Sequence, residues 1–326
     1  MFEGHNRKLR INEVATRDGL QNEASFVETD DKVALVDRLS TLGYAKIEVT
    51  SFTSAAAIPA LRDAEAVMQR IERALGVVYT ALIPNVRGGE RALECRVDEF
   101  NLVMSASETH NLANLRMTRA QSLRQLADVS ALALGAGVPV NVSLSCVFGC
   151  PMEGEVPEDT VLELVGRFAA MGAIGVTLCD TTGMAYPTQV QRVCARVAQA
   201  YPELNVTGHF HNTRGMGLVN TLAAVQAGIC QFDMSLGGIG GCPYAPGASG
   251  NVATEDVVHM LQWMGYDTGV ELPGLILAAH ELERLVGHEL PAQVSRSGDR
   301  LIHHAPPQGF HEIRERALAR DAAPAK

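Results

Sequence analysis

The sequence predicts an α/β fold and, within that class, a closed (β/α)8 barrel, the TIM barrel, with extra C-terminal helices. Three observations lead to this prediction. Short β-rich runs alternate eight times with helical segments. Several helical segments end in glycine just before the next strand. Nearly every strand is apolar through its body and turns polar at its C-terminal end, where barrel enzymes collect their catalytic groups.

Eight short segments carry the strand pattern. They are 9–16, 45–52, 77–83, 99–105, 138–146, 173–179, 204–211 and 231–236. Because helical segments lie between them, the strands are expected to pair in parallel through right-handed crossovers. An open doubly wound sheet is the alternative, but its glycine-rich turn is missing after the first strand, where the chain reads Arg17-Asp18-Gly19. The closed barrel is therefore favoured.

Alanine- and leucine-rich segments with apolar residues three and four apart predict the helices. Clear examples are 31–42, 64–75, 119–135, 157–171, 187–200 and 215–227. Two further helices are predicted after the eighth unit, at 254–263 and 272–286. We expect residues 1–295 to form a single catalytic domain of barrel and C-terminal helices, and residues 296–326 to be a peripheral or partly disordered tail.

Composition narrows the class of protein. Of 326 residues, 47% are hydrophobic and 20% are charged, and the net charge of −10 argues against nucleic acid or an anionic membrane as the main partner. The first ten residues lack the apolar centre of a secretory signal, and no stretch is apolar enough to cross a bilayer. Seven cysteines without a repeating spacing favour reduced thiols. We therefore expect a cytoplasmic protein.

Two histidines, His209 and His211, close the seventh strand. Alternate residues of a strand point to the same face, so both imidazoles project together. Paired imidazoles that converge with a carboxylate are ligands for a divalent metal. Asp18, after the first strand, joins them if the two strand ends share one rim of the barrel. The alternative is one core histidine and one surface histidine.

Several charged residues are expected beside this group. Arg17 would face the same mouth and stabilise negative charge on a carbonyl oxygen, unless it forms a surface ion pair with Asp18. Glu48 is predicted inside a strand, where an unpaired carboxylate is costly, which favours a functional or ion-paired role. Glu13 and Asp180 are candidates to orient the ligands or Arg17.

A glycine-rich segment at 236–251 follows the eighth strand. It predicts a mobile loop, with Cys242 at its centre. A free thiol over a barrel mouth suggests a proton donor or a group that closes over substrate, and an inert cysteine in a linker is the alternative. Asn251 offers an amide oxygen to a metal, unless it only caps the following helix.

Four segments resemble the 3-hydroxy-3-methylglutaryl-CoA lyases, a family of the metal-dependent barrel superfamily that also holds isopropylmalate and homocitrate synthases. They are 11–23, 47–52, 209–211 and 240–256. The runs Arg-Asp-Gly-Leu-Gln-Asn-Glu and Gly-Gly-Cys-Pro-Tyr-Ala are far more specific than a general barrel pattern. Many relatives have Asp where this chain has Asn212, and often Lys where it has Ala24. The missing lysine leaves substrate anchoring, and with it the substrate's identity, open.

The resemblance implies a set of site residues. The implied ligands of Mg²⁺ or Mn²⁺ are Asp18, His209, His211 and Asn251. Arg17 would stabilise the enolate of the departing acyl-CoA, and Cys242 would be the catalytic loop thiol. The implied supporting residues are Glu48, Glu13, Asp180 and Glu255. The resemblance also suggests a homodimer.

The expected activity is a metal-dependent lyase that splits 3-hydroxy-3-methylglutaryl-CoA, or a close 3-alkyl homologue, into acetyl-CoA and acetoacetate or another 3-oxo acid. The metal would chelate the substrate hydroxyl and a carboxylate oxygen, and the alkoxide would collapse to a ketone. The enolate takes its proton from Cys242 or from the neighbourhood of a metal-bound histidine such as His209.

Two other functions fit a barrel of this kind. A synthase that condenses acetyl-CoA with a 2-oxo acid would keep the fold and the metal, but the cysteine loop speaks against it. A barrel retained as a binding module is the third reading, and the complete set of ligands disfavours it. The basic residues that could bind the coenzyme A phosphates are Arg87, Arg91, Arg116 and Arg119. The alternative is that these arginines are solvated charges on helices.

Overall fold

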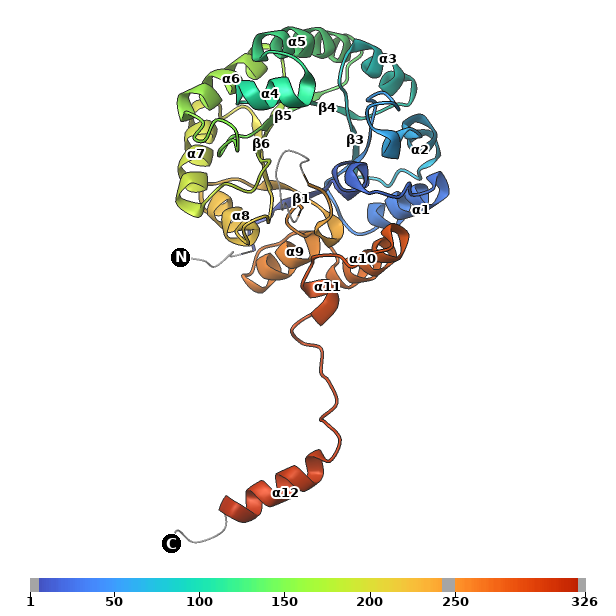
Figure 1. Cartoon of the computed structure of the whole chain (residues 1–326), viewed down its shortest axis with the longest axis vertical. Helices are drawn as coiled ribbons and strands as arrows, with labels where there is room; N and C mark the ends of the chain where they lie inside the picture. The colour runs from blue at the N-terminus through green and yellow to red at the C-terminus, as the bar shows by residue number, and fades with distance from the viewer. Residues whose placement is uncertain (1–5, 242–249, 322–326) are drawn as a thin grey trace.

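Eight parallel strands close on themselves in the computed structural model, which describes residues 6–241 and 250–321. Each strand pairs with the next along the chain, and β8 pairs with β1 to complete the ring (Figure 1). The strands are β1 (Arg10–Glu13), β2 (Lys46–Ser51), β3 (Val78–Leu82), β4 (Glu99–Ser105), β5 (Val140–Ser145), β6 (Gly175–Asp180), β7 (Asn205–Phe210) and β8 (Gln231–Met234). Each overlaps its predicted segment, and the (β/α)8 barrel is confirmed.

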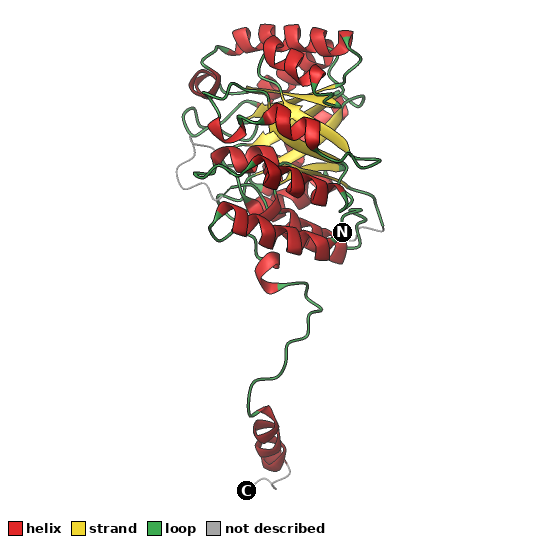
Figure 2. Cartoon of the chain, turned by 90° about the vertical axis from the view of Figure 1, so that its right-hand side faces the viewer, coloured by secondary structure: helices red, strands yellow, loops and turns green. Residues whose placement is uncertain are grey.

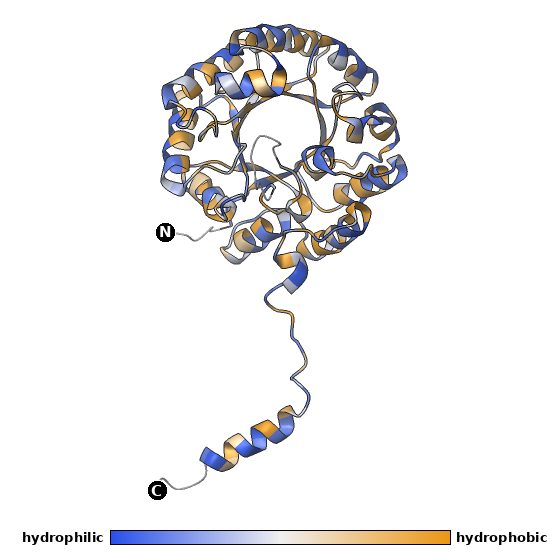
Figure 3. Cartoon of the chain, viewed as in Figure 1, coloured by the Kyte–Doolittle hydropathy of each residue, from blue (hydrophilic) through white to orange (hydrophobic). Residues whose placement is uncertain are grey.

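Helices surround the barrel and cover the outer face of the sheet (Figures 1 and 2), except for the short helix at 108–115, which lies inside the ring of the other helices and lines the cavity at the mouth. They are α1 (Thr29–Ser40), α2 (Ala64–Arg70), α3 (Val86–Glu94), α4 (Glu108–Leu115), α5 (Arg119–Gly135), α6 (Glu158–Ala170), α7 (Pro187–Ala200), α8 (Gly217–Gln226), α9 (Thr254–Trp263) and α10 (Leu272–Val286). Hydrophobic and hydrophilic residues follow one another along these helices (Figure 3), as one buried and one exposed face require. The helices α5, α7, α9 and α10 begin and end at the predicted residues.

Several elements are shorter than predicted, and the largest differences are in the second helix and the first strand. The helix predicted at 64–75 ends at Arg70, because Ile71 takes an extended conformation (φ −61°, ψ 144°). The strand predicted at 9–16 ends at Glu13, and Ala15–Gly19 forms a π-helix, η1. Within η1 the backbone N–H groups of three successive residues, 17 to 19, all point to the carbonyl oxygen of Val14. This turn buries Arg17 and Asp18 instead of letting the strand continue.

The interior of the barrel is polar. A small space along it is lined by side chains from all eight strands. They include Asn12, Lys46, Glu48, Thr80, Glu99, Asn101, Asn141, Thr177, Thr207, Gln231 and Asp233. Buried polar groups are stable only when they are paired, and Lys46 accordingly donates to both oxygens of Glu99 at 2.6 Å. Core residues such as Phe100, Phe168 and Phe232, which are fully buried, do not line this polar space.

The C-terminal segment leaves the barrel after a short helix, α11 (Val294–Ser297). Every described residue from 301 to 321 is exposed, including all of helix α12 (Phe310–Asp321), which stands away from the barrel in Figures 1 and 2. Part of the segment expected to be peripheral or partly disordered is thus helical, and a domain boundary at residue 295 stays a prediction. Among the described residues, no helix is both long enough and apolar enough to span a membrane.

Candidate functional site

Asp18, His209 and His211 meet at the C-terminal mouth of the barrel. Asp18 lies in η1, His209 is in β7, and His211 follows that strand directly. One ligand atom from each residue lies within 4.8 Å of the others, and all three residues are buried. The convergence expected from the sequence is therefore present, and it joins residues almost 200 positions apart.

The two imidazoles face each other through their Nε2 atoms, which are 3.2 Å apart. Two nitrogens that each lie about 2.1 Å from one cation can be this close. The pKa of His211 is lowered to about 3 by burial and by the neighbouring His209, so His211 is neutral and its lone pair is available. A neutral imidazole is the form that binds metal.

Asp18 is held ionised at this position. Burial alone would raise its pKa, but the charge of Arg17, together with His209 and the hydrogen bond from Asn251, outweighs burial and lowers the pKa of Asp18 to about 2. Arg17 NH1 donates to Asp18 Oδ1 at 2.6 Å, and Asn251 Nδ2 donates to Asp18 Oδ2 at 2.8 Å. The expected metal ligand Asn251 thus touches the carboxylate ligand.

The donor set fits a divalent cation. Asn251 Oδ1 and His211 Nδ1 are buried side-chain atoms with no hydrogen-bond partner among the residues that the structure describes. Buried polar atoms are rarely left in this state, and an amide oxygen beside a carboxylate and two imidazoles offers the oxygen and nitrogen ligands of Mg²⁺ or Mn²⁺. This fit supports the expected ligand set, although the amide of Asn251 turns its nitrogen, and not its oxygen, toward Asp18.

Arg17 lies between two carboxylates. Its Nε donates to Glu48 Oε2 at 2.6 Å, and its NH1 donates to Asp18. Burial disfavours the charged guanidinium, but Glu48 and Asp18 outweigh burial and raise the pKa of Arg17. The ion-paired role expected for Glu48 is therefore found, and the pair with Asp18 is buried and not a surface contact. A fixed positive charge at the mouth is suited to stabilise a developing oxyanion.

Asp180 has a different place from the one expected. Its Oδ1 accepts hydrogen bonds from the backbone N–H groups of Met184 (2.7 Å) and Ala185 (3.0 Å), so it shapes the loop after β6. No hydrogen bond joins it to Arg17 or to a proposed ligand in the part of the chain that the structure describes. Burial, partly offset by these bonds and by His209, raises the pKa of Asp180 to about 6.

Glu13 ties several elements together below the site. Its carboxylate accepts hydrogen bonds from the backbone N–H groups of Ala15 (2.8 Å) and Leu236 (2.9 Å). It also accepts from the hydroxyl groups of Tyr44 (2.6 Å) and Thr254 (3.0 Å). The residue therefore joins the start of η1 to the segment after β8 and to α9. It supports the site without contacting the proposed ligands.

The sequence pattern did not single out Asp233 on β8. This residue pairs with His209 in the strand register, and its Oδ2 lies 3.7 Å from His209 Nδ1. The sequence does contain a pattern that could have indicated Asp233, because Gln231 and Asp233 are polar residues at alternate positions of a strand. Glu48 is likewise a polar residue inside a strand. The proposed catalytic residue Cys242 lies outside the described residues.

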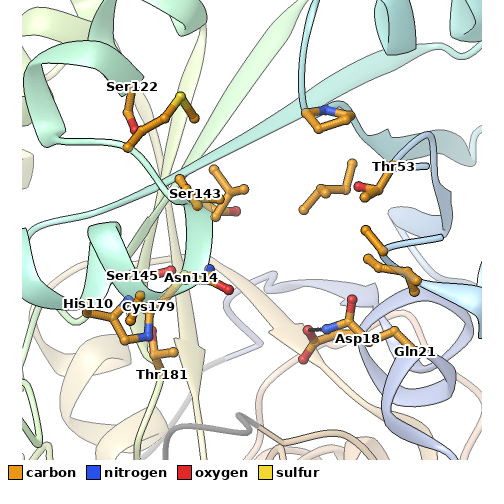
Figure 4. Close-up of a pocket in the computed structure, with 18 of the residues that line it drawn as sticks. Asp18, Gln21, Thr53, His110, Asn114, Ser122, Ser143, Ser145, Cys179 and Thr181 are labelled. Atoms are coloured by element: carbon orange, nitrogen blue, oxygen red, sulfur yellow. Dashed lines mark hydrogen bonds between the residues drawn. The ribbon is translucent and has the colours of Figure 1, made fainter. Parts of the chain in front are cut away.

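A cavity of about 850 Å³ opens above the site. Figure 4 shows Asp18 and Gln21 on one side of it and His110, Asn114 and Thr181 facing them. Further residues make part of its wall apolar: Ala57, Ile58, Leu82, Pro84, Val103, Leu115, Met117 and Leu126. Such a cavity has room for an acyl group and for the chain that leads from it to the surface.

Among the four basic candidates for coenzyme A, only Arg116 is in the cavity wall. It is exposed and stands in the left-handed conformation (φ 58°) at the end of α4. Arg91 and Arg119 form ion pairs with Glu65 and Glu108. Arg116 is therefore the better candidate for coenzyme A, because Arg91 and Arg119 are paired with glutamates away from the cavity wall.

A family model described as HMGL-like matches residues 8–282. The chain belongs to this family. A hydroxymethylglutaryl-CoA lyase of Bacillus subtilis is 45% identical over 287 residues, which cover 88% of this chain and 96% of that protein. An (R)-citramalyl-CoA lyase of Chloroflexus aurantiacus is 39% identical over 300 residues, covering 89% of this chain and 95% of the relative.

A solved structure agrees with these relatives. It is an HMG-CoA lyase from Acinetobacter baumannii in complex with coenzyme A and 3-methylmalate. It is 45% identical in sequence, with a TM-score of 0.88 over 92% of this chain and 98% of that one. This chain is accordingly a hydroxymethylglutaryl-CoA lyase-type enzyme of the oxo-acid lyase class.

Proposed function

We propose that the enzyme holds Mg²⁺ or Mn²⁺ and cleaves 3-hydroxy-3-methylglutaryl-CoA, or a close 3-alkyl homologue, into acetyl-CoA and a 3-oxo acid. The observation that carries this proposal is the buried convergence of Asp18, His209 and His211 beside Arg17. The ligands of the cation would be these three residues and Asn251. When bound, the cation supplies Lewis-acid polarisation of the substrate's hydroxyl and fixes its orientation.

The 3-hydroxyl group gives its proton to water in the cavity, the carbon–oxygen single bond becomes a carbonyl, and the electron pair of the adjacent carbon–carbon bond passes to the departing acetyl-CoA enolate. Arg17 would stabilise the enolate oxygen, because its charge is held at the mouth by Glu48 and Asp18. The carbon of the enolate then takes up a proton, which turns it into acetyl-CoA.

Cys242 is our candidate for the group that returns this proton. Gly241, which directly precedes it, lines the cavity, and the carbonyl oxygen of Gly241 accepts a hydrogen bond from Asn22 Nδ2 at 2.9 Å. Gly241, the residue before Cys242, is therefore held in the wall of the cavity that contains Arg17 and Asp18. A Cys242→Ser variant tests this role, because it should bind substrate normally and turn it over slowly.

The condensing synthase is the weaker alternative. It would use the same cation site, but the relatives described above are named as lyases. The substrate of the Chloroflexus relative also shows that lyases this similar differ in the acyl group they split. We therefore keep the 3-substituent of the substrate open, as the loss of lysine at Ala24 suggests.

A spectrophotometric cleavage assay tests the proposal. The purified enzyme is given 3-hydroxy-3-methylglutaryl-CoA and citramalyl-CoA, each with Mg²⁺, with Mn²⁺ and with a chelator. We expect turnover with a cation and none with chelator. If no 3-hydroxy-3-alkylglutaryl-CoA is cleaved, the substrate proposal is wrong, and thiol release from acetyl-CoA with 2-oxo acids would identify the synthase.

We further propose a homodimeric, cytoplasmic enzyme. The family resemblance supports the dimer, and seven cysteines without a repeating spacing support reduced thiols in the cytoplasm. Light scattering after size-exclusion chromatography measures the mass directly. A mass near that of one 34.9 kDa chain would contradict the dimer.

A further inference from the structure

Asn101 on β4 connects the polar interior of the barrel to the arginine of the site. Asn101 Nδ2 donates to Glu48 Oε1 at 2.7 Å, while Arg17 Nε donates to Glu48 Oε2 at 2.6 Å. The two oxygens of the Glu48 carboxylate therefore accept hydrogen bonds from two different residues, one from Asn101 and one from Arg17. All three residues are buried, and Glu48 is only 4% exposed, so water does not compete for these bonds.

The amide of Asn101 is itself fixed from the opposite side. Its Oδ1 accepts hydrogen bonds from Asn141 Nδ2 and from Ser143 Oγ, both at 3.0 Å. Asn141 in turn donates to Thr177 Oγ1 at 3.0 Å. With two donors at Oδ1, the amide cannot flip without losing both bonds, so its NH2 group stays directed at Glu48. A chain of hydrogen bonds thus runs from β6 through β5 and β4 to Glu48.

We propose that Asn101 is a positioning residue for the lyase reaction, acting on Arg17 through Glu48. A carboxylate held at one oxygen only can rotate, whereas Asn101 fixes its plane and thereby the direction of the Arg17 guanidinium. Reacting groups misplaced by about 1 Å cost on the order of 100-fold in rate. This inference rests on the proposed role of Arg17 at the enolate.

Two variants test the inference by steady-state kinetics. Asn101→Asp keeps the shape and replaces the donor with an acceptor that repels Glu48, and Asn101→Ala removes the amide without adding charge. We expect kcat to fall about 10- to 100-fold, the loss of one buried hydrogen bond to a charged group. KM for the acyl-CoA should change less than about threefold, since Asn101 is outside the cavity wall.

A matched control is Asn220→Ala. Asn220 is fully buried on α8 and donates to the carbonyl oxygen of Ala185 at 3.0 Å, away from Arg17. It should lower the melting temperature as much as Asn101→Ala does and leave kcat within about twofold. If the Asn101 variants keep the wild-type kcat, or lose no more than the control does, the inference is wrong.

A double-mutant cycle separates positioning from a general structural effect. Arg17→Lys keeps the charge but loses the Nε–H donor to Glu48, so Asn101 can no longer act through it. In the Arg17→Lys background, Asn101→Ala should cost little further activity. A further loss as large as in the wild-type background would overturn the positioning role. If Arg17→Lys and Arg17→Ala both keep wild-type kcat, the proposed role of Arg17 fails instead, and the inference falls with it.

Discussion

Asp233 Oδ2 lies 3.7 Å from His209 Nδ1, so a carboxylate on β8 faces the ring nitrogen opposite the one that points to His211. Asp233 is itself held by Asn12 Nδ2, which donates to its Oδ1 at 2.7 Å. Burial lowers the pKa of His209, but the carboxylates of Asp233 and Asp18 outweigh burial and raise it. A carboxylate behind a metal-binding histidine fixes its orientation and raises its basicity as a ligand.

Asp233→Asn should therefore weaken cation binding. The amide keeps the shape but loses the charge that holds His209 Nδ1–H, and changes of this kind cost about 10- to 100-fold in metal affinity. Titration calorimetry with Mn²⁺ measures the effect. Asp128→Asn, an exposed carboxylate of α5, is the charge control and should bind as the wild type does. Wild-type affinity in Asp233→Asn would contradict the orienting role.

His211→Ala should abolish the cation site more completely. It removes a neutral imidazole whose Nε2 is 3.2 Å from that of His209. Losing a ligand should cost at least as much as losing a carboxylate behind it, about 100-fold or more in Mn²⁺ affinity. His280→Ala, which loses only a contact to the carbonyl oxygen of Ser295, is the matched control. The prediction fails if His211→Ala still binds Mn²⁺ and is still inhibited by chelator.

Much of the fold could be predicted because local patterns of apolar and polar residues indicate its helices and strands. Apolar residues at spacings of three and four located α5 and α9 to the residue, and short β-rich runs located all eight strands. The π-helix after β1 was not predicted. It depends on the carbonyl oxygen of Val14 and the carboxylate of Glu13 capturing the next N–H groups, which is a tertiary arrangement.

Residues of the candidate site could be predicted where a suitable side chain also stands at the C-terminal end of a predicted strand. His209 and His211 share a face by strand geometry, and Asp18 and Arg17 follow the first strand, so they are expected at the same rim of the barrel. Asp233 and Asn101 were missed because a polar residue inside a strand acquires meaning only when the barrel closes. Closure sets Asp233 behind His209, and Asn101 behind Glu48. No spacing along the chain contains that information.

Arg116→Ala should weaken binding of the acyl-CoA without changing the chemistry. Arg116 is the exposed arginine of the cavity wall, whereas the residues of the cation site are buried. Loss of one exposed charge contact to a phosphate is expected to raise KM about two- to fivefold and leave kcat unchanged. The difference should shrink at high salt. Arg167→Ala on α6 is the control, and equal KM values for both variants would contradict the assignment.

Glu255→Gln should flatten the dependence of stability on pH. Glu255 is buried on α9 and accepts from the backbone N–H of Gly237, and burial raises its pKa to about 8 from an ordinary value of 4.5. Between these values the folded state holds a proton that the unfolded state has released. Its stabilising contribution is therefore complete below pH 4.5 and is lost as the pH rises through about 8.

Glutamine keeps the acceptor and cannot ionise, so this contribution should be absent from the variant. Urea unfolding at several pH values between 5 and 8 measures the free energy of unfolding, and one proton corresponds to a slope of about 1.4 kcal/mol per pH unit. Glu312→Gln, on the exposed helix α12, is the control and should keep the wild-type slope. An unchanged slope in Glu255→Gln would show that this carboxyl is ionised in the folded enzyme.

Removal of the tail should distinguish two boundaries of the catalytic domain. Truncation after residue 300 deletes a stretch whose described residues, 301–321, are all exposed and include α12, and it should leave kcat and the melting temperature unchanged. Truncation after residue 295 also deletes Arg296, which donates to the carbonyl oxygen of Leu290 at 2.7 Å, and Arg300, which lies 4.2 Å from the ring of Trp263. These contacts hold α11 against the neighbouring helices, so the shorter protein should lose about 1 kcal/mol of stability and melt about 2 °C lower. Equal melting temperatures for the two truncations would place the boundary at residue 295, as the sequence pattern suggests.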